Sequence, residues 1–213
     1  MVGKIKNMDE LHFPLIALSR LRMGTDGKGV TTLVAGAGCP LSCDYCINRR
    51  LLKEAPQESV TAEELLERVR VDDLYFRATG GGVTFGGGES LLHAEFIRRF
   101  RDLCPPEWQI AAETSLAVPR ERILSAMAAV DEFIVDCKDM DTDIYRRYTG
   151  GDIRLMKDNL EFLLASCGPE RFLVRVPYIP GFNTVEDQAR SLECLKKMGV
   201  TRLELFDYIV RSE

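Results

Sequence analysis

From residue 29 onward, short apolar runs rich in branched and aromatic residues alternate with segments that carry helix signals. The runs are typical of buried strands and cover residues 30–35, 82–85, 109–113, 132–136, 172–177 and 202–206. Helix starts between them are marked by Thr61 with Glu64, by Ser90, by Pro119 and by Thr184. Strands that alternate with helices pair in parallel through right-handed crossovers. Because six such units are too few for a closed eight-strand barrel, we expect an α/β fold, a partial (β/α)6 TIM-like barrel with an open, mostly parallel sheet and outer helices.

Length and composition restrict the class of protein further. The 213 residues suit one domain, which we expect to cover 1–213 with an irregular N-terminal segment over 1–25. No apolar run approaches the ~18 residues of a membrane span, and the first residues do not form an apolar export segment. Seven cysteines, three of them crowded together, do not suit a secreted disulfide scaffold, and a net charge of −5 argues against a non-specific nucleic-acid surface. We therefore expect a cytoplasmic protein without a nucleic-acid or membrane partner.

Three cysteines, Cys39, Cys43 and Cys46, form a C-x3-C-x2-C run directly after the first expected strand. Three thiolates in one tight loop can each bind a different iron of a [4Fe–4S] cube, which leaves the fourth iron open to a substrate. Structural zinc usually has four closed ligands with paired spacings, whereas the other cysteines are scattered and the two histidines form no pair. The cube is the favoured interpretation, and a non-enzymatic zinc module stays open as an alternative.

Glycines and an acid follow the second expected strand. Gly87 and Gly88 let the backbone approach a ligand closely, and Glu89 places a carboxylate there that suits an ammonium group. The alternative is a flexible turn, with Glu89 in the first turn of the next helix.

Polar residues also follow the next three strands. Glu113 and Thr114 end the third, and Arg175 lies near the end of the fifth. Asp136 and Lys138 end the fourth, where strand alternation puts both on one face. These residues predict a polar site at the mouth of the barrel. The alternatives are a rim salt bridge between Asp136 and Lys138, and a salt bridge from Arg175 to an acid, either Glu170 or Asp136.

The cysteine spacing, with Tyr45 before the last cysteine, resembles the signature of the radical S-adenosylmethionine (SAM) superfamily. Residues 80–90 and 136–150 resemble the activating enzymes of glycyl radical enzymes, of which the pyruvate formate-lyase activating enzymes are familiar members. The likeness runs from about Asp26 to Phe206. It implies reductive cleavage of SAM at a [4Fe–4S] cluster, giving a 5′-deoxyadenosyl radical that abstracts hydrogen from a backbone glycine of a partner glycyl radical enzyme.

The resemblance also implies roles for the site residues. The three cysteines would hold one cluster, the element Gly87, Gly88 and Glu89 would hold the methionyl amine, and Asp136, Lys138 and Arg175 would bind other parts of SAM. Glu113 and Thr114 match an acid–threonine pair that helps to bind a monovalent cation, with Glu113 standing where Asp is usual. A flavodoxin- or ferredoxin-type electron donor is the second expected partner.

Several positions depart from the family pattern. Lys28 and Thr31 change a loop linked to recognition of the glycyl radical partner, and Ile47 and Ile209 stand where histidines are usual. No cysteine lies between Cys46 and Cys104, so a ferredoxin-like insertion is not expected, and the chain ends at residue 213, where relatives often continue. The departures support a second hypothesis, a radical SAM enzyme that modifies another peptide or a small metabolite.

Overall fold

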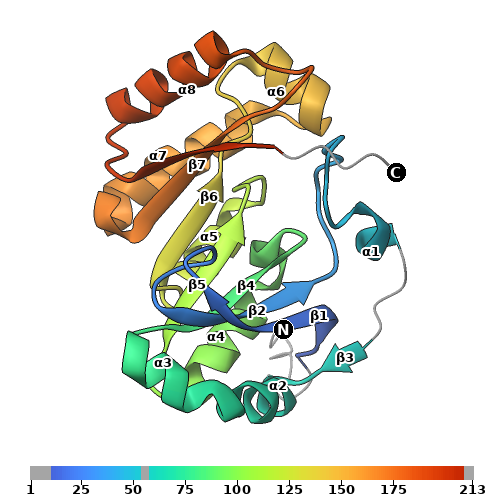
Figure 1. Ribbon diagram of the computed structural model, residues 1–213, viewed down its shortest axis with the longest axis vertical. Helices are drawn as coiled ribbons and strands as arrows, with labels where there is room; N and C mark the ends of the chain where they lie inside the picture. The colour runs from blue at the N-terminus through green and yellow to red at the C-terminus, as the bar shows by residue number, and fades with distance from the viewer. Residues whose placement is uncertain (1–10, 54–57, 209–213) are drawn as a thin grey trace, which may run out of the picture.

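Six parallel strands make up most of one sheet, as the alternating sequence pattern predicts (Figure 1). The computed structural model describes residues 11–53 and 58–208, and the strand order within them is β3-β1-β2-β4-β5-β6-β7-β8. The parallel strands are β2 (Val30–Gly36), β4 (Gly82–Gly87), β5 (Gln109–Thr114), β6 (Glu132–Asp136), β7 (Phe172–Tyr178) and β8 (Leu203–Asp207). The prediction of an open α/β partial barrel is confirmed.

Two antiparallel strands extend the sheet beyond β2, where the sequence predicts an irregular segment. β1 (Phe13–Met23) pairs with β2, and β3 (Glu58–Val60) pairs with the other edge of β1. The prediction over 1–25 is therefore wrong for β1, while residues 1–10 lie outside the described part, as does Ile209. A register shift between Ser19 and Arg22, with Leu21 at a φ of 56°, interrupts the period-two pattern that would have identified the strand.

Apart from α1 (Arg49–Lys53), which borders the cavity described below, the longer helices lie along the outer side of the curved sheet (Figure 1). They are α2 (Ala62–Val69), α3 (Asp73–Thr79), α4 (Ala94–Leu103), α5 (Arg120–Met127), α6 (Thr142–Thr149), α7 (Ile153–Cys167) and α8 (Val185–Lys197). Short 3-10 turns are η2 (Arg70–Asp72), η3 (Ser90–His93) and η4 (Pro169–Arg171). None of the helices in the described ranges has the length and apolarity to cross a bilayer.

Local capping explains where several helices begin. Thr61 forms a capping box with Glu64, and Thr184 forms one with Asp187. The sequence predicts the first box, and it predicts Thr184 as a cap. The prediction that Ser90 caps its helix is wrong, because the Glu89 side chain accepts the Leu91 N–H at the start of η3. The capping residue is thus Glu89, whose carboxylate also belongs to the site described below.

The core lies between the sheet and the outer helices. Trp108, Phe85, Phe100, Phe133 and Phe172 are fully buried there, and the rings of Phe133 and Phe172 stack at 5.6 Å. Burial of such aromatic and branched side chains is the main favourable contribution to folding. Because the core fills the outer face of the sheet, polar residues are left at the carboxyl ends of the strands and inside the barrel.

Candidate active site

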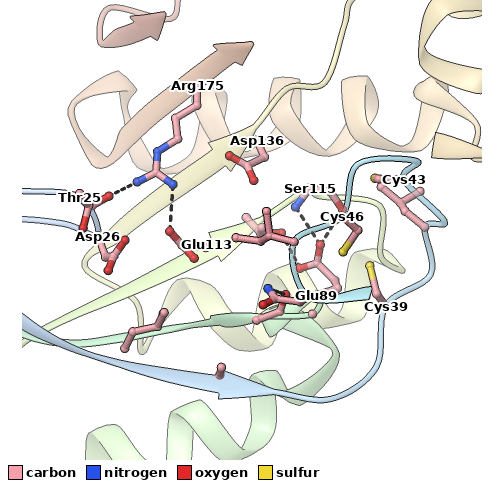
Figure 2. Close-up of a pocket in the computed structure, with 18 of the residues that line it drawn as sticks. Thr25, Asp26, Cys39, Cys43, Cys46, Glu89, Glu113, Ser115, Asp136 and Arg175 are labelled. Atoms are coloured by element: carbon pink, nitrogen blue, oxygen red, sulfur yellow. Dashed lines mark hydrogen bonds and ion pairs between the residues drawn. The ribbon is translucent and has the colours of Figure 1, made fainter. Parts of the chain in front are cut away.

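The carboxyl ends of the parallel strands surround a cavity of ≈ 680 Å³ (Figure 2). Every site residue that the sequence predicts lines this cavity: Cys39, Cys43, Cys46, Gly87, Gly88, Glu89, Glu113, Thr114, Asp136, Lys138 and Arg175. Figure 2 shows the cysteines and Glu89 at one end and Arg175 with Glu113 at the other. Residues spread over much of the chain therefore meet in one place.

The loop after β2 carries the three cysteines and is fixed by hydrogen bonds to the end of α6. The Ser42 N–H donates to the Thr149 carbonyl at 2.8 Å, and the Asp44 N–H donates to the Tyr148 carbonyl at 3.1 Å. The Tyr45 ring packs edge-on against Tyr148. The aromatic residue before the last cysteine therefore anchors the loop, and the thiols face the cavity on either side of it.

Burial disfavours the thiolate form of Cys39 and Cys43. Desolvation, with smaller contributions from Glu89 and the other two cysteines, raises the pKa of Cys39 to about 11. Desolvation also raises the pKa of Cys43, although Lys138 opposes this. Thiolate ligands gain most from a cationic iron–sulfur core in such a setting. The donor set therefore fits a cluster.

The spacing of the thiols also bears on the kind of metal. Across the described residues, no group of three or more His, Cys, Asp or Glu side chains converges as the ligand set of a single metal ion. A cube spreads its three thiolates over three irons, whereas zinc draws its ligands to one point. Three thiols around a cavity fit the cube better than a closed zinc site.

The turn after β4 brings backbone against the start of the cysteine loop. The N–H groups of Gly88 and Glu89 donate to the carbonyls of Gly36 and Gly38 at 2.9 and 2.8 Å. A Cβ on Gly88 would lie 2.0 Å from the Gly38 oxygen, so this approach requires glycine. Asn48 on the other side of the cysteines donates to the Gly87 carbonyl at 2.7 Å. The sequence assigned no role to Asn48, which here joins the two halves of the site.

Four protein donors surround the Glu89 carboxylate, which is 2% exposed. Oε1 accepts from the Thr114 hydroxyl at 2.6 Å and the Leu91 N–H at 3.1 Å. Oε2 accepts from the N–H and the hydroxyl of Ser115 at 2.8 and 2.6 Å. Burial raises the pKa of Glu89, and these donors oppose the rise. The carboxylate thus ties the turn after β4 to the end of β5, and its contact with an amine stays a prediction.

The sequence did not single out Ser115. It directly follows the polar pair Glu113 and Thr114 at the end of β5, and that position was the available signal.

Asp136 and Lys138 lie on the cavity side of the chain after β6, as the alternation predicts. Lys138 Nζ is 3.0 Å from Asp136 Oδ2, while the intervening Cys137 is fully buried in the core. Burial disfavours the ammonium, but Asp136 and Tyr208 outweigh it and raise the pKa of Lys138 well above its usual value. Lys138 is therefore a fixed positive charge, and the predicted salt bridge itself lines the cavity.

Arg175 occupies the opposite end of the cavity. Its Nη1 is 2.9 Å from Glu113 Oε1, and its Nε is 3.3 Å from Glu204 Oε2. The alternative prediction named Glu170 or Asp136 as its partner, and the ion pairs form with Glu113 and Glu204 instead. Nη2 donates to the Thr25 carbonyl in the turn between β1 and β2. The sequence did not predict the position of this turn, whose residues Thr25 and Asp26 both line the cavity.

The residues expected to hold a monovalent cation do not fit one. Glu113 Oε1 is bonded to Arg175, and a Cβ on Gly86 would lie 2.6 Å from Oε2. The Thr114 hydroxyl donates to Glu89 and accepts the Leu116 N–H at 2.9 Å. Glu113 Oε1 and the Thr114 hydroxyl, which a cation would use, are thus engaged by the protein.

Comparison with known proteins identifies the family. Residues 33–193 match the family model described as the radical SAM superfamily. The pyruvate formate-lyase-activating enzyme of Clostridium pasteurianum is 31% identical over 185 residues, covering 86% of this chain and 77% of that protein. The indoleacetate decarboxylase activating enzyme of Tractidigestivibacter scatoligenes is 29% identical, covering 76% of this chain. This chain spans 58% of the length of that second relative.

Solved structures share the fold at low sequence identity. Streptococcus suis SuiB bound to S-adenosylmethionine superposes with a TM-score of 0.64 at 11% identity, over 82% of this chain and 39% of that one. At this identity the likeness concerns the partial-barrel fold.

Proposed function

Since the chain belongs to the radical SAM superfamily, whose cofactors are a [4Fe–4S] cluster and SAM, we propose that it activates a partner glycyl radical enzyme. The observation that carries the proposal is the meeting of the C-x3-C-x2-C thiols and the Gly87–Gly88 backbone at one cavity. The likeness to a pyruvate formate-lyase-activating enzyme and to an indoleacetate decarboxylase activating enzyme supports the choice of a glycyl radical enzyme as substrate.

When bound, the two cofactors would supply a 5′-deoxyadenosyl radical and methionine, at the cost of one electron from a flavodoxin- or ferredoxin-type donor. Cys39, Cys43 and Cys46 would hold the cluster through three of its irons. The Gly87–Gly88 backbone would border the methionyl group of SAM from the turn after β4, a turn that requires glycine because a Cβ there would meet Ala35 or the Gly38 oxygen. One hydrogen atom would then pass from a backbone glycine of the partner to the 5′ carbon, which leaves a glycyl radical and 5′-deoxyadenosine.

Charged residues of the chain would orient the ligand. Lys138, a fixed positive charge on the cavity wall, suits a carboxylate, and Asp136 beside it suits a hydroxyl or amine. The two charges lie side by side on one wall of the cavity and would bind groups of opposite charge next to each other there, which favours one orientation of the ligand.

The test is anaerobic electron paramagnetic resonance. The reduced, reconstituted protein is mixed with SAM and a glycyl radical enzyme encoded beside it, and a glycine-centred doublet is expected. Two controls accompany it: the partner with its radical glycine replaced by alanine, and C43A of this chain. SAM cleavage without a doublet for any such partner would contradict the proposal.

That contrary result would favour the second function, modification of another peptide or of a small metabolite. The observation that keeps this alternative is the turn over residues 24–29, where Lys28 departs from the family pattern and Thr25 and Asp26 line the cavity. Formation of 5′-deoxyadenosine only with a peptide or metabolite library, and not with the glycyl radical enzyme, would decide for it.

A further inference from the structure

The acidic side chains at the Arg175 end of the cavity are each paired with a basic side chain of the same chain. Glu113 contacts Arg175 at 2.9 Å, Asp136 contacts Lys138 at 3.0 Å, and Asp26 contacts Arg22. An acid–threonine pair at the end of β5 is where the resemblance implies a monovalent cation. The carboxylate there already has a cationic partner.

We propose that the guanidinium of Arg175 replaces the monovalent cation, so that this chain binds SAM without sodium or potassium. The proposal rests on the proposed function only in taking this cavity as the SAM site. It predicts a property in which this chain differs from the family that it resembles.

The guanidinium is held in a way that an exchangeable ion is not. It donates to Thr25 in the β1–β2 turn, to Glu113 on β5 and to Glu204 on β8, so three separate elements fix its position. An arginine remains charged at every pH that the fold survives, and its planar fork suits several acceptors at once. A cation that bound Oε1 of Glu113 would have to displace the guanidinium.

The remaining oxygens offer a cation little. The Thr114 hydroxyl is committed to Glu89 and to the Leu116 N–H, and Oε2 of Glu113 packs against the backbone of Gly86. The longer side chain of Glu113, compared with Asp, brings its carboxylate within reach of Arg175 on the second strand along. The single change from Asp to Glu thus accounts for the internal ion pair.

The first experiment measures SAM binding to the reconstituted protein by calorimetry in potassium, sodium and choline chloride at equal ionic strength. The dissociation constants are expected to agree within about twofold. A rise of about tenfold or more in choline, reversed by added potassium, would overturn the proposal.

A second experiment does not need SAM. Thallium-205 resonance follows Tl⁺, a potassium probe, in the presence of the protein. The native chain is expected to show no saturable shift of the line, and a saturable shift that potassium reverses would overturn the proposal. If SAM binds in none of the three salts, the proposed function fails. The thallium measurement then still tests whether Arg175 takes the place of the cation.

Two variants separate the charge from the geometry. R175M is expected to gain a saturable thallium shift, because Glu113 then lacks the guanidinium. R175K keeps a positive charge near Glu113 and is expected to gain none. A folded R175M without the shift would overturn the replacement, and if R175M does not fold, R175K and the native protein still decide.

Discussion

Arg175 on β7 donates a hydrogen bond to the carbonyl oxygen of Thr25, a residue 150 positions earlier in the chain. The same guanidinium contacts Glu113 on β5 and Glu204 on β8. One side chain thereby links the β1–β2 turn to the far edge of the sheet across the interior of an open barrel. Its loss is expected to affect the whole fold and not β7 alone.

Replacing Arg175 by methionine is expected to lower the free energy of unfolding by about 1–3 kcal/mol, because the half-buried Glu113 is left without its partner. The double variant R175M/E113L is expected to lose less, since no unpaired charge remains. Urea unfolding of the native protein, both single variants and the double variant measures the coupling. Losses that simply add would contradict the importance of this ion pair.

Replacing Cys43 by alanine removes one of the three thiols proposed to hold the cluster. The iron content of anaerobically reconstituted protein is expected to fall well below about four per chain, with loss of the brown absorption. C167A is the matched control, because Cys167 lies at the end of α7 and does not line the cavity. Iron content and absorption spectra of the two variants decide the matter. Equal iron in both would argue against Cys43 as a ligand.

Replacing Gly88 by alanine is expected to disrupt both halves of the site. The new Cβ would lie 2.0 Å from the Gly38 oxygen, so the turn after β4 must move away from the cysteine loop. G80A is the control, since Gly80 ends α3 at a φ of 68° with open space around a Cβ and its cost is limited to about 1–2 kcal/mol of backbone strain. Calorimetry is expected to show that G88A no longer binds SAM and that G80A still binds it. Binding in G88A at native strength would show that the approach of the two backbones is not required.

Asp72 gives the stability a defined pH dependence. Its fully buried carboxylate accepts hydrogen bonds from Arg20 and Thr32. Burial opposes ionisation, but these two donors outweigh it and lower the pKa of Asp72 below its usual value. A lowered pKa contributes stability that is present above about pH 4 and is lost as the pH falls through the folded-state pKa.

The measurement for Asp72 compares the native protein with D72N. At pH 7 the variant is expected to be less stable by about 2 kcal/mol, in line with hydrogen bonds to a charged group. Guanidinium unfolding from pH 7 to pH 3 should show this difference shrinking as the pH falls. A difference that is constant over this range would mean that Asp72 is not charged in the native state.

The sequence was sufficient for the parallel strands and for the part of the cavity lining at their carboxyl ends. Cys39 and Gly88 follow strands and Asp136 ends one, and parallel strands bring their carboxyl ends together, so their meeting follows from topology. The register of a strand with a bulge does not follow from local pattern, which is why β1 was missed.

The partners of Arg175 were beyond the sequence. Arg175 was expected beside Glu170 or Asp136, whereas the register of β7 with β8 places Glu204 beside it and the β1–β2 turn brings Thr25 to it. The cap at η3 went to Glu89 in place of Ser90 because Glu89 is held from the other side by Ser115. In both cases, contacts between distant segments decided what neighbouring residues could not.

Asn48 donates a hydrogen bond to the Gly87 carbonyl, and Gly88 and Glu89 donate to the start of the cysteine loop. The turn after β4 and the cysteine loop are therefore expected to open together. Occupancy of either half should then slow the opening of the other. The protein with SAM bound is accordingly expected to lose iron to oxygen or to a chelator more slowly than the protein without SAM.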